Sequence, residues 1–255
     1  DAFRKLEDAL KEFQKEEQRI LDQTAEAMVD VRLIPDLHSV LTLKAEIGDF
    51  DGLPMISLRQ TPLAGWNLVL KGVLDLVVGG LACLILAVPM AVIAIIIKIT
   101  SPGPVFYKQK RMGMDGKVFD CIKFRSMRVD AEADGAKRTV PGDPRRTRFG
   151  AFMRRFNIDE LPQLFNVLKE DMSLVGPRPE RPVFVEEYKK RIPGYMLRHK
   201  IKAGMTGWAQ INGWRGDTSL EKRIQYDLYY IEHWSLWFDI YILLMTPFKG
   251  LQNAY

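Results

Sequence analysis

The sequence feature that most constrains the fold is an uncharged apolar run from Leu76 to Ile97. As a helix, its roughly 22 residues would measure about 33 Å, close to the hydrocarbon thickness of a bilayer. A single-pass membrane anchor is one interpretation. Pro89 counts against it, because an internal proline breaks or kinks a helix. The break would leave arms of about 13 and 9 residues, and neither is long enough to span a bilayer.

Basic residues flank this run on both sides, with Lys71 before it and Lys98 and Lys108 after it. A spanning helix normally carries its positive charges on the cytoplasmic side only. The symmetry favours a re-entrant helix, at about residues 68–99, that enters the membrane and returns to the same cytoplasmic face. If Pro89 controls this topology, Pro89→Ala should let the run span.

Two neighbouring carboxylates, Asp159 and Glu160, stand where an apolar-periodic segment should begin a helix. Asn157 or Asp159 can serve as its N-cap, and Pro162 is tolerated in a first turn. Adjacent helical residues lie about 100° apart, so the two acids are expected to have different roles rather than share a proton. One could be a nucleophile and the other a ligand of Mg²⁺. The alternative is that both only cap the helix.

The chain is basic, with a net charge of +5 and a pI of about 9.1, which indicates an anionic partner. Lys123 and Arg125 would share one face of a strand within residues 118–127, suited to binding phosphates. Arg154 belongs to an arginine-rich stretch just before the acids, and the Gly176–Pro179 turn presents Arg178. Nucleic acid is the rival partner, but no nucleic-acid-binding module is recognisable.

Other residue patterns add boundaries and exclusions. The two cysteines and three histidines are scattered, which argues against disulfides, zinc and a His-based site. Residues 130–144 resemble a mobile loop over the site. The chain starts at Asp1, which suggests a fragment or processed form. The expected elements are a helix over 1–28, strands at 29–33 and 55–58, a helix over 182–191, a helix from a Thr218–Glu221 capping box to Ile231, and a core or interfacial helix at 234–245.

Five ordered motifs together resemble a known family, the bacterial sugar transferases. These are monotopic polyprenyl-phosphate hexose-1-phosphate transferases that initiate exopolysaccharide, O-antigen and capsule assembly. The resemblance covers about residues 66–255. The motifs that carry it, after the apolar run with its proline, are Ser101–Phe106, Lys123–Met127, Asp159–Gln163, Ser173–Pro179 and Gly207–Gly213.

The resemblance implies a helix-rich, mixed α/β fold. Residues 66–255 would form a monotopic membrane catalytic domain with a re-entrant N-terminal helix, short strands and interfacial amphipathic helices. Residues 1–65 resemble the end of the Rossmann-like module that larger members carry, followed by a linker. The implied location is the cytoplasmic face of the bacterial inner membrane, and the N-terminal helix makes a homodimer plausible.

The implied reaction transfers hexose 1-phosphate from a UDP-hexose, UDP-glucose or UDP-galactose, to undecaprenyl phosphate and releases UMP. Asp159 would form a covalent aspartyl-phosphosugar intermediate, and Glu160 would bind Mg²⁺. Pro89 matches the helix-breaking proline of the family, although Val88 stands where some members have Ser. By motif position, the substrate-binding residues would be Lys123, Arg125, Arg154, Arg178, Pro179 and Asp227.

Two other functions compete with this one. A membrane-anchored, non-enzymatic regulator binding anionic lipid would release no UMP and would tolerate Asp159→Asn. A lipid-diphosphate hydrolase would release free sugar phosphate without needing an acceptor. Neither accounts for the ordered motifs.

Overall fold

The computed structural model describes residues 62–132, 135, 142–216 and 218–249, together with short pieces at 15–16, 18–20, 32–33, 47–50 and 53–57. Most of the helix expected over residues 1–28 and part of the loop expected at 130–144 lie outside the described residues. Before residue 62, three strands form an antiparallel sheet in the order β1-β3-β2. They are β1 (Arg32–Leu33), β2 (Ile47–Phe50) and β3 (Leu53–Ser57). β3 overlaps the strand expected at 55–58.

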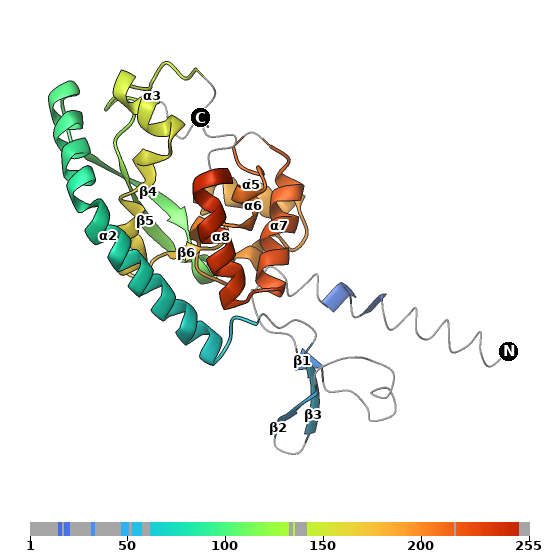
Figure 1. Ribbon diagram of the computed structural model, residues 1–255. Coiled ribbons are helices and arrows are strands. Elements are labelled where there is room, and N and C mark those ends of the chain that lie inside the picture. Colours follow the sequence, from blue (N-terminus) through green and yellow to red (C-terminus); the bar gives the residue numbers. More distant parts are fainter. Residues whose placement is uncertain are drawn as a thin grey trace.

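Helix α2 (Trp66–Thr100) is a single helix of 35 residues that continues through Pro89. It is long and apolar enough to cross a membrane by length and composition. The break expected at Pro89 is therefore absent, whereas the alternative, a kink, fits the bent helix (Figure 1). Proline removes one N–H and crowds one carbonyl, which a bend can accommodate. Figure 1 shows α2 as one bent helix along one side of the domain.

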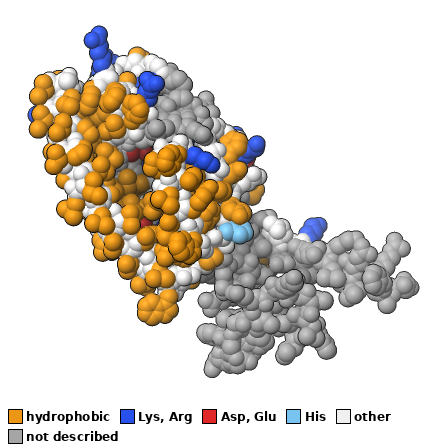
Figure 2. Space-filling view, in the orientation of Figure 1, with side chains coloured by type: hydrophobic (Ala, Val, Ile, Leu, Met, Phe, Trp, Pro, Cys, Tyr) orange, Lys and Arg blue, Asp and Glu red, His pale blue; other side chains and the backbone are white. Residues whose placement is uncertain are grey.

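One face of α2 packs on the domain over most of its length. Its buried residues run from Lys71 and Asp75 near one end to Met90 and Ile97 near the other. Lys71 Nζ donates to Asp239 Oδ2 at 2.7 Å, which ties α2 to the last described helix. The outer face is apolar and exposed, for example at Leu84 and Ile85. Figure 2 shows this face as a broad hydrophobic surface.

The remaining strands form two small pairs. β4 (Phe106–Met112) and β5 (Val118–Phe124) are antiparallel neighbours. β6 (Ser173–Val175) and β7 (Gly204–Thr206) are parallel. The helices between and after them are η2 (Met114–Gly116), α3 (Arg148–Arg155), η3 (Ile158–Glu160), α4 (Gln163–Leu168), α5 (Pro182–Arg191), η4 (Tyr195–His199), α6 (Trp208–Ile211), α7 (Leu220–Glu232) and α8 (Leu236–Lys249). The predicted helix-rich, mixed α/β character is confirmed.

The C-terminal helices refine the predictions. α5 has the predicted bounds. α7 is capped by Ser219, whose hydroxyl accepts a hydrogen bond from the Lys222 amide, so the capping box predicted on Thr218 is wrong by one residue. α8 combines both interpretations of the tail, because Ile242 is buried in the core while Trp237 is exposed.

Candidate active site

The acidic pair lies on the short 3-10 turn η3, just before α4. Asn157 introduces this turn in the left-handed conformation, with φ 56°. Its side chain does not cap the turn, and its Oδ1 accepts a hydrogen bond from Arg215 Nη2 at 2.7 Å. α4 starts after Pro162, without a side-chain cap. Neither acid caps a helix, so the interpretation of the pair as caps is wrong.

Glu160 is held by two cations from distant elements. Its Oε1 accepts a hydrogen bond at 2.7 Å from Nζ of Lys123, which lies on β5. Arg178 binds both carboxylate oxygens, with Nη1 at 3.0 Å from Oε2 and Nη2 on Oε1. Burial by itself would raise the pKa of Glu160, but the charges of Arg178 and Lys123 outweigh burial and hold this pKa well below its usual range. Glu160 is therefore a fixed negative charge.

Asp159 lies beside it in a different environment. It is buried, and Arg154 Nε lies 4.0 Å from its Oδ2. Arg154 also donates from Nε to Ser126 Oγ at 2.8 Å. Burial and the neighbouring charge of Glu160 raise the pKa of Asp159 above its usual value. The two carboxylates thus differ, with Glu160 stabilised as an anion and Asp159 less strongly paired.

Arg178 is presented by a turn that close backbone packing holds in place. The Gly176 amide donates to the Thr206 carbonyl at 2.9 Å. A Cβ added at Gly207 would stand 2.3 Å from the Gly176 carbonyl oxygen, so only glycine fits there. Gln210 Oε1 accepts Arg178 Nη1 at 3.0 Å. The Ser173–Pro179 and Gly207–Gly213 motifs therefore meet at the guanidinium of Arg178.

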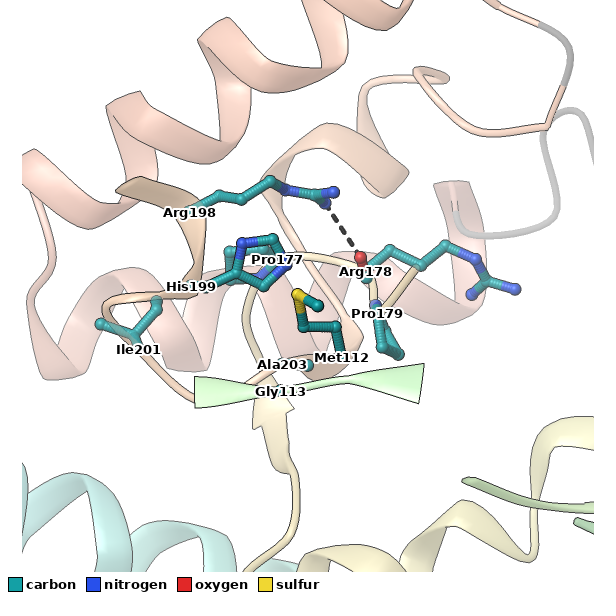
Figure 3. Close-up of a pocket in the computed structure, with 9 residues that line it drawn as sticks. All are labelled: Met112, Gly113, Pro177, Arg178, Pro179, Arg198, His199, Ile201 and Ala203. Carbon is teal, nitrogen blue, oxygen red and sulfur yellow. Dashed lines mark hydrogen bonds between the residues drawn. The ribbon is translucent and has the colours of Figure 1, made fainter. Parts of the chain in front are cut away.

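The predicted substrate residue Asp227 lies behind this turn. It is buried in an ion pair with Arg198, at 2.7 Å from Nη2 to Oδ2. Arg198 Nη2 also donates to the Arg178 carbonyl at 2.9 Å, the dashed bond in Figure 3. Figure 3 centres on a small cavity behind the turn, lined among others by His199, Ile201 and Ala203. The Arg178 guanidinium points away from this cavity (Figure 3). Asp227 thus supports the backbone of Arg178.

Arg125 binds backbone carbonyls at the end of α2. Its guanidinium donates to the carbonyls of Ser101 and Pro102, each at 2.7 Å. β5 ends at Phe124, although the Arg125 amide still donates to the Val105 carbonyl at 2.9 Å. Arg125 thus fastens the chain after α2, and its role beside Lys123 in binding phosphates stays a prediction. Pro179, another predicted substrate residue, directly follows Arg178 in the turn. Its carbonyl oxygen accepts a hydrogen bond from Arg111 Nη1 at 2.8 Å.

Sequence reasoning did not single out Arg215 or Gln210 as site residues. Both belong to or adjoin the Gly- and Trp-rich segment at 201–214, whose polar residues were the available signal. Arg215 is largely buried, and burial and the charge of Arg178 lower its pKa to about 10. Four cations, from Lys123, Arg154, Arg178 and Arg215, thus surround or adjoin two carboxylates, which leaves an excess of positive charge for an anionic ligand.

Within the part of the chain that the structure describes, no group of three or more His, Cys, Asp or Glu side chains could hold a metal by itself. This is compatible with Mg²⁺, which is commonly bound by one or two carboxylates together with substrate phosphates. Glu160 fits such a role if Lys123 and Arg178 release its oxygens to phosphate.

Comparisons with known proteins point in one direction. Residues 66–253 match the family described as bacterial sugar transferase. The chain is 46% identical over 239 residues to the UDP-glucose:undecaprenyl-phosphate glucose-1-phosphate transferase of Escherichia coli (strain K12), covering 92% of this chain and 52% of that protein.

Two further relatives extend the range. A protein of that same description from Xanthomonas campestris pv. campestris is 44% identical, covering 89% of this chain and 49% of its own length. The UDP-N-acetylgalactosamine-undecaprenyl-phosphate N-acetylgalactosaminephosphotransferase of Aeromonas hydrophila is 39% identical. This match covers 90% of this chain and 54% of the length of that protein. The chain spans about half the length of these relatives.

Proposed function

Because the chain belongs to the bacterial sugar transferase family, we propose that it transfers glucose 1-phosphate from UDP-glucose to undecaprenyl phosphate and releases UMP. This would be the first membrane step of a polysaccharide pathway. The observation that carries the proposal is the pair of neighbouring carboxylates with unequal environments, held among cations from four segments of the chain.

In the proposed first step, an oxygen of ionised Asp159 attacks the phosphorus that carries the sugar. An Asp159–phosphorus bond forms, the bond to the bridging oxygen breaks, and UMP leaves with that oxygen. In the second step an oxygen of the lipid phosphate attacks the same phosphorus and frees Asp159. Covalent catalysis divides one transfer between a soluble and a lipid substrate into two simpler displacements.

The cations serve binding and charge stabilisation in this scheme. Arg178 has the planar fork that matches two phosphate oxygens, and it is bound to Glu160 in the same manner. Lys123 and Arg154 adjoin the two acids and would stabilise charge on the transferred phosphoryl group. Arg215, close to Arg178, adds positive charge for the diphosphate.

Mg²⁺ would be held jointly by Glu160 and the diphosphate, where it supplies charge neutralisation. Binding requires Lys123 and Arg178 to turn from Glu160 towards phosphate. Glu160→Gln should then weaken the Mg²⁺ dependence of UMP release. An unchanged Mg²⁺ titration in this variant would remove Glu160 as a metal ligand.

We further propose that α2 lies in the cytoplasmic face of the bacterial inner membrane and does not span it. Lys71, near its start, pairs with Asp239, while Ile97, near its end, packs in the same cluster as Phe124. Both ends of the helix therefore contact one domain. A helix with its outer face in lipid and its inner face on that domain would hold the acids near headgroup height, where the lipid phosphate is found.

The decisive experiment measures UMP release from a panel of UDP-sugars, with and without undecaprenyl phosphate. We expect UDP-glucose to be used and a labelled sugar phosphate to become attached to the protein when the acceptor is omitted. Absence of UMP release with every sugar would favour a regulator. Steady release of free sugar phosphate without an acceptor would identify a hydrolase.

A further inference from the structure

An open apolar groove runs between α2 and the strands that lead to the acidic pair. Its volume is about 250 Å³. Sites that enclose a small molecule usually measure about 300–1,000 Å³, so this groove suits a short stretch of chain rather than a whole ligand. Its lining residues are all apolar, and they are Cys83, Ala87, Met90, Ala91, Ala94, Phe106, Phe124 and Phe165.

The lining excludes a polar occupant. A headgroup, sugar or peptide backbone buried here would lose its hydrogen bonds to water without replacement. The groove is kept open by Ala87, Ala91 and Ala94, whereas the exposed positions around them on α2 carry larger side chains such as Val92 and Ile95. The occupant is therefore a hydrocarbon chain.

The groove is continuous with the packing beneath the acidic pair. Phe124 directly follows Lys123, which pairs with Glu160. Phe165 lies on α4, just after the turn that bears both acids. Ile158 and Leu161, on either side of the pair, pack in the same hydrophobic cluster as Met90, Phe124 and Phe165. A chain in the groove would have one end close to the acids and their cations.

The other end of the groove reaches the apolar outer face of α2. Ala87 and Ala91 lie between Ile85, Val88 and Val92, which are all at least half exposed. An occupant can therefore enter from the lipid phase without crossing a polar surface.

We infer that this groove holds the isoprenoid units nearest the phosphate of the lipid acceptor, and so aligns that phosphate with Asp159. The inference rests on the proposed function, since it specifies where the second substrate lies. The exposed residues of α2 would remain in contact with the chains of membrane lipid. The groove would distinguish the branched chain of the acceptor from those lipid chains.

Filling the groove should weaken the use of the acceptor only. We expect Ala91→Leu and Ala94→Leu to raise the KM for undecaprenyl phosphate by about tenfold, which corresponds to about 1.4 kcal/mol. UMP release from UDP-glucose without acceptor should be unchanged. Val88→Phe and Val92→Phe are the controls, because they add comparable bulk to α2 at exposed positions outside the groove and should leave both steps unchanged.

A second measurement does not depend on these variants. Wild-type protein irradiated with a polyprenyl phosphate that carries a diazirine on its first isoprene units should be labelled at Phe106 or at the groove positions 87, 90, 91 and 94 of α2. Labelling confined to the outer positions 84, 85 and 88, or groove variants with the KM of the controls, would overturn the inference. Failure of the wild type to release UMP would instead overturn the proposed function.

Discussion

Arg178 binds Glu160 through both terminal nitrogens of its guanidinium. Nη1 lies 3.0 Å from Oε2, and Nη2 donates to Oε1. This geometry is the one that a guanidinium uses to bind phosphate. Glu160 therefore occupies Arg178 much as two phosphate oxygens would. An incoming diphosphate would compete with the carboxylate for a cation that is already oriented.

Arg178→Lys tests the need for the fork rather than the charge. Lysine keeps the positive charge but cannot make two parallel bonds. We expect kcat/KM for UDP-glucose to fall about 10- to 100-fold, the equivalent of about 1.5–3 kcal/mol for a hydrogen bond to a charged group. The control is Arg128→Lys, at an exposed ion pair with Asp130. Equal activity of both variants would exclude a role for the fork.

Asp159→Asn separates catalysis from stability. The raised pKa of Asp159 means that the folded protein holds this proton more tightly than the unfolded chain does. That stabilising contribution is complete below the unfolded pKa and is lost as the pH rises through the folded pKa, so the ionised form costs stability at neutral pH. We expect Asp159→Asn to abolish the sugar-phosphate adduct and to raise the Tm at pH 7, by about 2–4 °C per kcal/mol. An adduct that persists would remove Asp159 as nucleophile.

Glu160→Gln should have the opposite effect on stability. The variant leaves Arg178 and Lys123 without their buried anion, at a cost of about 3–5 kcal/mol at neutral pH. Because the folded pKa of Glu160 is depressed, its contribution is present above the unfolded pKa and is lost as the pH falls through the folded pKa. Chemical unfolding should show that the free energy of unfolding differs strongly between wild type and Glu160→Gln at pH 7, and that this difference is smaller in acid. Glu170→Gln, at an exposed ion pair with Lys202, should change stability little at either pH.

Asp227→Asn distinguishes support of the turn from direct substrate binding. Removing the charge leaves Arg198 buried without its anion, so we expect the free energy of unfolding to fall by about 3–5 kcal/mol. UMP release should fall as well, because Arg198 also holds the Arg178 carbonyl. A variant of normal stability that has lost only affinity for UDP-glucose would restore Asp227 to the substrate-binding residues. Asp130→Asn, at an exposed acid, is the control.

Pro89→Ala should leave the topology of α2 unchanged. The helix already passes through Pro89, and its ends are attached to the domain through Lys71 and Ile97. Alanine would only allow one more backbone hydrogen bond. Single cysteines at positions 67 and 108, labelled with a membrane-impermeant maleimide, should be reached from the same side in both proteins. Movement of one position to the other side would show that Pro89 does control topology.

Sequence reasoning was most accurate where the signal was local. The apolar run, the helix at 182–191 and the short strands follow from residue pattern within a few positions of each element. It left a break and a kink both open at Pro89, because sequence gives the cost of a proline but not the packing that keeps the helix continuous around it. It also did not foresee that the Arg125 guanidinium binds the Ser101 and Pro102 carbonyls, because these contacts join residues 24 and 23 positions apart in the sequence.

By itself, the sequence determined membership of the bacterial sugar transferase family, through its ordered motifs, since these are properties of residue type and order. Only the tertiary structure decided which charges meet. Glu160 with Arg178 and Lys123, Arg198 with Asp227, and Lys71 with Asp239, 168 residues apart, are brought together by packing of the elements that carry them. The physical reason is that ionic and hydrogen-bonded contacts act over a few ångströms, and the chain reaches such distances between remote residues only after its apolar faces have been buried against one another.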